Sequence, residues 1–250
     1  MLMIPVSITR LAVGVAVLAG ALVGPIQTSA AQTRSQLQRA VEDALHEDRA
    51  LGTLEVSVEV DQVTLTGEVR TFWEKNEALR RTFEVKGVNT VVSEIDVPIA
   101  DSQENLAEEV VKAIQDYPHY RVWDHLDGGL NNGVVTLSGR VTPERDKTGE
   151  LFERIAKVRG VQDVQMRIDV LPTNRQDDEL RRAIARRVFR SEHFDRFGSM
   201  NNPPFHIVVH NSNVTLVGYV QSEIERIEME RIVGQTQGVM RVENQLQTLR

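Results

Sequence analysis

The 250-residue sequence contains no cysteine. This absence excludes disulfide bonds, thiolate metal sites, a cysteine nucleophile and a lipoprotein anchor, which needs a cysteine at the mature N-terminus. The sequence also lacks the short motifs of serine hydrolases, phosphate-binding loops, zinc-binding helices and dinucleotide folds. We therefore expect a protein that is not an enzyme, with no cofactor and no evident small-molecule substrate.

Long hydrophobic runs are also scarce, and the one present lies at the N-terminus. Arg10 precedes an uncharged apolar run from residue 11 to 24, and Ser29-Ala30-Ala31 follow it. This order predicts a secretory signal peptide over residues 1–31, cleaved after Ala31. An uncleaved anchor is the alternative, although the run is shorter than the roughly 20 residues that span a bilayer. We expect a periplasmic protein, with a position peripheral to a membrane left open.

The chain carries no excess of positive charge. Its formal net charge is −7, from 29 basic and 36 acidic residues. An acidic chain without a dominant basic face argues against nucleic acid as a partner.

The sequence contains a three-fold internal repeat. A strand-like motif of alternating apolar residues around a glycine occurs at 63–69, 135–141 and 214–220. The glycine suggests a bulge or a close backbone approach. Twenty or 21 residues later, each copy has a Gly-Val pair and then a further short strand pattern. These pairs are Gly87-Val88, Gly160-Val161 and Gly238-Val239.

Each repeat reads as α-β-β-α-β in about 70 residues. Helical spacing of apolar residues precedes each strand pair and recurs before each Gly-Val pair. The crossover helix makes the last strand parallel to the second. We therefore predict an α+β fold of three tandem modules, each a three-stranded mixed sheet with two helices on one face. The predicted boundaries are 34–100, 104–172 and 177–250, which we call units 1, 2 and 3.

The three motifs in register resemble the BON domain family of bacterial envelope proteins. The resemblance rests on the V-T-L-x-G-x-V strand, the later Gly-Val pair and the final strand, and it covers the chain beyond the signal segment. Units 2 and 3 also resemble a secreted multi-BON subgroup through 117–126 and 203–209. The family implies phospholipid or envelope binding, with links to osmotic or envelope stress. It assigns no catalytic residues.

Histidines and carboxylates offer few combinations for chemistry. His206 and His210 share a strand face, and His119, Asp124 and His125 lie near a turn. A zinc site needs three or four converging ligands, whereas the sequence shows only pairs. We therefore predict no metal site, and Asp124 and Asp127 are not expected to act as a catalytic pair.

Charge differs between the units, and unit 3 holds the basic excess. Residues 34–98 and 101–172 have net charges of −5 and −4, whereas 173–250 have a net charge of +1. The excess lies in the helix from Glu179 to Arg190, where three arginines spaced by four form a ridge. The candidate lipid-binding residues are Arg182, Arg186, Phe189, Arg190, Phe194 and Phe197.

Two interpretations of this helix remain open. Arginines attract anionic head groups, and aromatic side chains enter the acyl boundary. Alternatively, the arginines form a solvated face and the three phenylalanines complete the core. A second candidate surface is the aromatic segment Tyr117, Tyr120 and Trp123 of unit 2, for which core packing beside a turn is the alternative. Within that segment we expect residues 120–123 to alternate along a strand.

The leading hypothesis is a secreted, envelope-associated binding protein that binds anionic phospholipid weakly and protects against envelope or osmotic stress. The partner is then an anionic phospholipid membrane surface. The alternative is a protein–protein interaction scaffold of the cell envelope, in which acidic units 1 and 2 hold an envelope protein and lipid has no role. Lipid binding requires the arginine helix, whereas a scaffold requires exposed apolar or sheet-edge surface.

Overall fold

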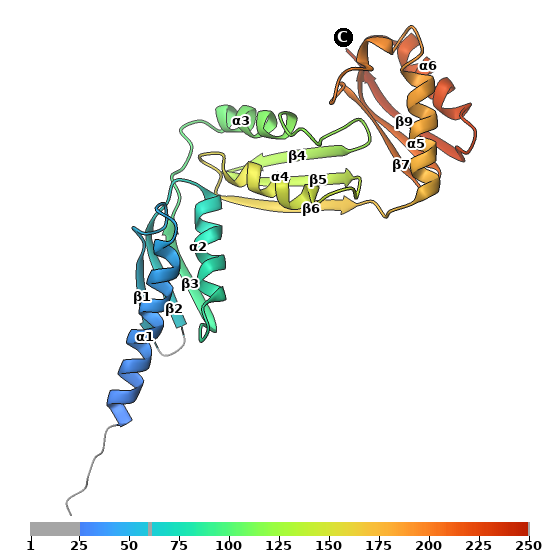
Figure 1. The fold of residues 1–250 in the computed structure, drawn as a ribbon. Helices are drawn as coiled ribbons and strands as arrows, with labels where there is room; N and C mark the ends of the chain where they lie inside the picture. Colours follow the sequence, from blue (N-terminus) through green and yellow to red (C-terminus); the bar gives the residue numbers. More distant parts are fainter. Residues whose placement is uncertain (1–25, 60–61, 250) are drawn as a thin grey trace, which may run out of the picture.

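The computed structural model describes residues 26–59 and 62–249. It consists of three similar units that follow one another along the chain and form an elongated molecule (Figure 1). The first 25 residues of the predicted signal peptide lie outside the described residues, and helix α1 begins at Ile26. Among the described residues, no helix combines the length and apolar character needed to cross a bilayer.

All three units have the element order α-β-β-α-β. Unit 1 contains α1 (Ile26–His46), β1 (Glu55–Glu59), β2 (Gln62–Glu68), α2 (Phe72–Glu84) and β3 (Thr90–Asp96). Unit 2 contains α3 (Gln103–Gln115), β4 (His125–Asn131), β5 (Val134–Val141), α4 (Lys147–Ala156) and β6 (Asp163–Val170). Unit 3 contains α5 (Arg175–Val188), a 3₁₀ turn η1 (Asp195–Phe197), β7 (Phe205–His210), β8 (Asn213–Val220), α6 (Glu223–Gly234) and β9 (Arg241–Thr248).

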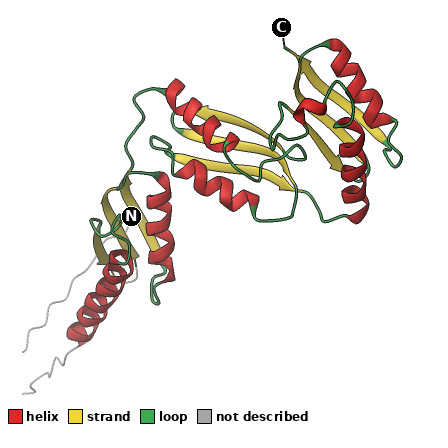
Figure 2. Ribbon diagram, turned by 45° about the horizontal axis from the view of Figure 1, so that its top comes forward, coloured by secondary structure: helices red, strands yellow, loops and turns green. Residues whose placement is uncertain are grey.

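Each sheet has the predicted mixed topology. The first two strands of a unit pair antiparallel, and the last strand pairs parallel with the central one. Both helices of a unit lie on one face of its sheet (Figure 2). The predicted α+β fold of three tandem modules is therefore confirmed.

Tight turns close the hairpins of units 2 and 3. The backbone has positive φ at Asn132 (48°) and Gly133 (78°), and at Asn211 (50°) and Ser212 (63°). Two successive residues with positive φ give a turn whose twist matches that of paired strands. These turns join β4 to β5 and β7 to β8.

The motif glycine has the close backbone approach that the sequence suggests. Gly139 has φ of 131°, and a Cβ atom there would lie 2.1 Å from the carbonyl oxygen of His125 on the neighbouring strand. At the matching Gly218, with φ of 103°, a Cβ would lie 2.4 Å from the carbonyl oxygen of Pro204. A side chain at either position would push the hairpin apart.

Units 1 and 2 meet through aromatic rings and one amide. Phe72 and Trp73 at the start of α2 each lie 6.2 Å from the ring of Phe152 on α4. Gln162 donates its side-chain N–H groups to the carbonyls of Val97 (3.2 Å) and Pro98 (3.0 Å). These contacts join the helical layer of unit 1 to that of unit 2.

Candidate functional site

Helix α5 is held on unit 3 by its first turn and by one apolar stripe. The Asn174 side chain accepts a hydrogen bond from the backbone N–H of Gln176 (2.9 Å), which satisfies a free donor of the first turn. Asp177 accepts from the backbone N–H groups of Asn211 (2.8 Å) and Ser212 (2.9 Å). The helix start is thereby tied to the β7–β8 turn. Buried side chains continue along the stripe at Leu180, Ile184 and Val188.

The arginines of α5 divide into two groups. Arg181 is buried and donates to the carbonyl of Val209 (2.7 Å) and to Asp178 (2.7 Å), so it serves the structure of the unit. Arg182, Arg186 and Arg190, which we call the arginine ridge, are exposed. Within the described residues none of the three forms an ion pair. Their charge is therefore available to an external anion.

Phe194 and Phe197 after α5 belong to the core, and their prediction as lipid contacts is wrong, whereas Phe189 is only half-buried and its assignment remains a prediction. Phe194 is 0% exposed and Phe197 is buried. Their rings meet Phe205 edge-on, with centroids 5.7 and 5.2 Å from it. Phe189 is half-buried and stacks on Phe205 at 6.5 Å. All three pack there because unit 3 needs side chains to cover the start of β7 on its helical side.

The exposed apolar residues beside the ridge are aliphatic and lie on α6. Ile224 and Ile227 are 67% and 55% exposed. A groove of about 700 Å³ runs between the two helices, with Arg186, Arg187 and Arg190 on one wall and Arg231 on the other. Arg187 donates to the carbonyl of Gln235 (2.9 Å), which joins the C-terminal parts of α5 and α6.

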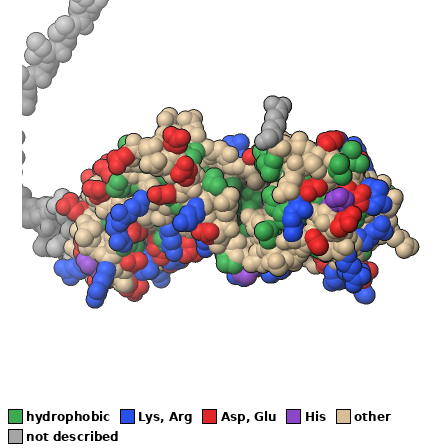
Figure 3. Space-filling model, turned by 90° about the horizontal axis from the view of Figure 1, so that it is seen from above, with side chains coloured by type: hydrophobic (Ala, Val, Ile, Leu, Met, Phe, Trp, Pro, Cys, Tyr) green, Lys and Arg blue, Asp and Glu red, His purple; other side chains and the backbone are tan. Residues whose placement is uncertain are grey.

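Sequence reasoning missed the two isoleucines, although the sequence holds a signal for them. Helix α6 has Met229, Ile232 and Val233 for the core, and a second apolar pair outside that stripe. Ile224 and Ile227 lie four residues before Glu228 and Arg231, which line the groove, so they share its outward side. Lys and Arg side chains are visible on both lobes of the molecule, including the right-hand lobe that unit 3 forms (Figure 3).

The aromatic segment of unit 2 forms the junction with unit 3, and the strand predicted over 120–123 is wrong. The first strand of unit 2 begins only at His125. Tyr117, Tyr120 and Val122 are buried. Val122 packs into the core of unit 3, and its carbonyl accepts a 2.6 Å hydrogen bond from the N–H of Ile207. The segment is therefore inter-unit core and not an exposed binding surface.

A buried ion pair fixes the loop that carries this junction. Asp124 and Lys147 are 0% and 1% exposed, and their charged groups lie 2.8 Å apart. Asp124 also accepts from the N–H of Arg121 (2.9 Å) and from the N–H and hydroxyl of Thr142, both at 2.8 Å. These hydrogen bonds compensate for the removal of both charges from water. Asp127 is exposed on β4, so the two carboxylates do not meet.

The histidines lie in structural settings. His206 stacks on Tyr120 with centroids 4.9 Å apart, and its Nε2 lies 3.2 Å from the tyrosine oxygen. Burial lowers the pKa of His206 to about 4 and raises the pKa of Tyr120 to about 12. His125 lies 6.1 Å from His206, and burial also lowers its pKa. In the described part of the chain, no group of three potential ligands gathers for a metal ion.

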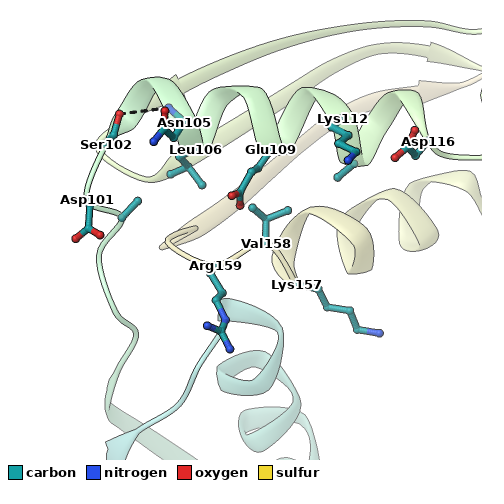
Figure 4. Close-up of a pocket in the computed structure, with 12 residues that line it drawn as sticks. Asp101, Ser102, Asn105, Leu106, Glu109, Lys112, Asp116, Lys157, Val158 and Arg159 are labelled. Carbon is teal, nitrogen blue, oxygen red and sulfur yellow. Dashed lines mark hydrogen bonds between the residues drawn. The ribbon is translucent and has the colours of Figure 1, made fainter.

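A polar cleft of about 560 Å³ lies between α3, the end of α4 and the linker before α3. Figure 4 shows Ser102 bonded to Asn105 at the start of α3, with Glu109 directed toward Val158 and Lys157 directed away from the cleft. Lys157 is engaged instead with Glu153 and with the ring of Trp73, 5.2 Å away. Charges of both signs alternate here, which gives the cleft no preference for one ionic ligand.

The BON domain family matches the chain three times, over residues 33–98, 102–172 and 176–250. The chain belongs to this family as a tandem of three BON domains. Membership of the family suggests a binding protein of the cell envelope.

Two solved structures are similar over most of the chain at low identity. One is the C-terminal domain of CdsD, the structural protein of the type III secretion system of Chlamydia trachomatis. It shares 14% identity, with 85% of this chain and 96% of that chain covered and a TM-score of 0.24. A second structure of CdsD gives 16% identity, 86% and 92% coverage and the same TM-score. These values are too low to support an inference about function. Among curated proteins, no relative matches the sequence.

Proposed function

We propose that this chain is a periplasmic binding protein, without a catalytic role, that attaches weakly to anionic phospholipid surfaces through the α5–α6 face of unit 3. The observation that carries the proposal is the arginine ridge, which is exposed and free of ion pairs within the described residues. By contrast, Arg80 on α2 and Arg226 on α6 are each paired with a neighbouring glutamate.

The charge of this face sets the strength of the attachment. Each arginine near an anionic membrane surface contributes about 1 kcal/mol. The three ridge residues therefore provide roughly 3 kcal/mol, which is a modest affinity. This attraction decays within about 10 Å at 0.1 M salt, so it weakens as the salt concentration rises.

The apolar part of the face is supplied by α6. The side chains of Ile224 and Ile227 are mostly exposed, and each lies one helical turn before a residue of the groove wall, Glu228 or Arg231. Aliphatic side chains beside cations fit the boundary between head groups and acyl chains. This arrangement replaces the phenylalanines that the sequence suggested, and it leaves the core of unit 3 intact.

The test is sedimentation of the full chain with neutral and anionic liposomes at low and high salt. We expect binding to anionic vesicles only, and its loss at high salt. Replacing Arg182, Arg186 and Arg190 with glutamate should abolish sedimentation. A matched control replaces three exposed arginines of unit 1 (Arg34, Arg39 and Arg49) with glutamate, which gives the same change in net charge.

Equal loss in both variants would show a general charge effect and contradict the assignment to unit 3. Absence of binding by the native chain would favour the envelope-protein scaffold, and crosslinking in the native envelope would then be the next step. A role in envelope or osmotic stress is part of the proposal, supported by family membership. It predicts that ridge variants protect cells less well against osmotic shock.

A further inference from the structure

Unit 2 contains an apolar hollow between α3 and the edge strand β4. Its volume is about 260 Å³. The walls include Val110 and Ile114 from α3, Leu126 and Leu130 from β4, and Val135 and Leu137 from β5. None of the described residues that line it is charged.

The hollow exists because one core side chain is missing. In each unit the first strand places one residue opposite the leucine of the central motif. In unit 1 that residue is Val56, opposite Leu65, and in unit 3 it is Ile207, opposite Leu216. Both side chains are buried. In unit 2 the residue opposite Leu137 is Gly128, so the volume that a branched side chain fills elsewhere is left open.

The backbone does not require glycine at this position. Gly128 lacks the positive φ that would strain an ordinary residue. A Cβ atom there would meet only Leu137 Cδ1 at 3.7 Å and the carbonyl of Thr136 at 3.9 Å, both ordinary contacts. A valine would therefore be accommodated, in contrast to the motif glycine at 139.

The hollow adjoins a polar recess at the junction of units 2 and 3. The two share Gln115, Tyr120 and Leu126, and the recess adds Asn202 and His206. Within the part of the chain that the structure describes, the side chains that line this recess carry no formal charge at pH 7. The side-chain oxygen of Asn202 is buried without a hydrogen-bond partner, which leaves one acceptor unsatisfied. Hydrophobic side chains are visible in the depression between the two units (Figure 3).

We propose that unit 2 binds a neutral single-chain amphiphile, with the alkyl chain in the hollow at Gly128 and a hydroxylated head group in the recess beside Asn202. The volume is below the roughly 300–1,000 Å³ of pockets for drug-sized ligands, so the site takes one slender chain and not a two-chain phospholipid. This ligand and its site are separate from the membrane face of unit 3.

The recess selects a neutral head group because it offers no counter-charge. A carboxylate would find no lysine or arginine among the lining residues, and an ammonium group would find no carboxylate. Burial lowers the pKa of both His125 and His206, so these rings are neutral at pH 7. A hydroxyl group can exchange hydrogen bonds with polar side chains of the recess such as Gln115 and Asn202.

The test is isothermal titration calorimetry of the full chain with three monomeric decyl probes: monodecanoylglycerol, decanoate and decyltrimethylammonium. We expect the neutral probe to bind at least tenfold more tightly than either charged probe. Gly128→Val should reduce its affinity at least tenfold while leaving the melting temperature unchanged or higher. Gly129→Val is the matched control: the backbone of Gly129 also borders the hollow, but its side chain would project from the opposite face of β4, where a Cβ meets no atom within 4 Å.

Several results would overturn the proposal. These are no binding of the neutral probe by the native chain, equal affinity for all three probes, or equal affinity in Gly128→Val. If the valine variant is poorly folded, Gly128→Ala provides a smaller change at the same place, and it should give an intermediate affinity. Vesicle sedimentation of Gly128→Val should equal that of the native chain, which separates this site from the membrane face.

Discussion

Units 2 and 3 share one fold and one register, yet they differ in surface and in core. The sequences of helices α3 and α5 can be aligned by matching Leu106 to Leu180, the first buried leucine of each helix. In that alignment the ridge positions Arg182, Arg186 and Arg190 of unit 3 correspond to Glu108, Lys112 and Asp116 of unit 2.

The cores of the two units also differ, because one is filled and the other contains a hollow. Unit 3 is filled by Ile207 and by the phenylalanines around Phe205, whereas unit 2 keeps a hollow beside Gly128. The module thus fixes the positions of helices and strands through its stripe residues, while the outward helix face and one core position are free to differ. In a tandem of this kind, the residues that differ between the units indicate the function of each unit.

The largest expected effect concerns the ion pairs of the two units. Lys147→Met leaves the carboxylate of Asp124 buried without its cation and should lower the free energy of unfolding by about 3–5 kcal/mol. In unit 3 the corresponding helix position is Glu225, and its partner Arg196 is 37% exposed. Glu225 is itself only 8% exposed but keeps the hydrogen bond from the backbone N–H of Gln221, so Arg196→Met should cost about 2 kcal/mol, less than the loss in unit 2. Urea unfolding followed by tryptophan fluorescence measures both changes.

If both variants lose the same free energy of unfolding, burial of the ion pair does not determine its contribution to stability. The double variant Asp124→Leu with Lys147→Met removes both charges together. It should recover much of the loss, because an apolar pair needs no compensation for desolvation.

A second difference lies at matching positions of the first strands, where His206 is buried and Asp127 is exposed. The pKa of His206 is lowered to about 4, so the folded state favours the neutral ring. Its contribution to stability is present above about pH 6.5 and is lost as the pH falls toward 4, because the unfolded chain takes up the proton first. The loss approaches 3 kcal/mol.

Urea unfolding at a series of pH values tests this contribution. His206→Gln should flatten the dependence between pH 6.5 and 4, whereas His193→Gln should preserve it. A His206→Gln variant with the native pH dependence would assign the effect to other groups of the junction, where Asp124 and His125 also act on this ring.

The smallest effect is a transfer of the ridge from unit 3 to unit 2. Glu108→Arg with Asp116→Arg gives α3 three cations in the ridge register. We expect vesicle affinity to rise by about 1 kcal/mol for each added arginine. The control, Asp127→Arg with Asp169→Arg, makes the same charge change on exposed strand positions. Equal gains would mean that net charge, and not the helix face, governs attachment.

Strand and helix order could be predicted from the sequence because each repeat has its own local period. The strand motifs at 135–141 and 214–220 lie within β5 and β8, as predicted. The segment at 120–123 misled the prediction because it alternates like a strand, whereas its partner is Ile207, 85 residues further along the chain. Phe194 and Phe197 follow the ridge in sequence, but local spacing does not reveal whether a loop residue turns inward.

The hollow beside Gly128 was not predicted, although the sequence holds a signal for it. The residue opposite the motif leucine lies nine positions before it in every unit (56 and 65, 128 and 137, 207 and 216), and only unit 2 has glycine there, but the space between α3 and β4 follows from packing. Ile224 and Ile227 could have been found from the second apolar pair of their helix.

The packing of Val122 into unit 3 has a consequence for how such tandems are inherited. The sequence repeat and the folded unit have different boundaries, because the core of unit 3 includes Val122 from unit 2. A recombination that exchanged only the final repeat would leave a gap in its interior. Phe72 and Trp73 of unit 1 pack in the same way against the core of unit 2, so all three units are expected to travel together through gene rearrangement.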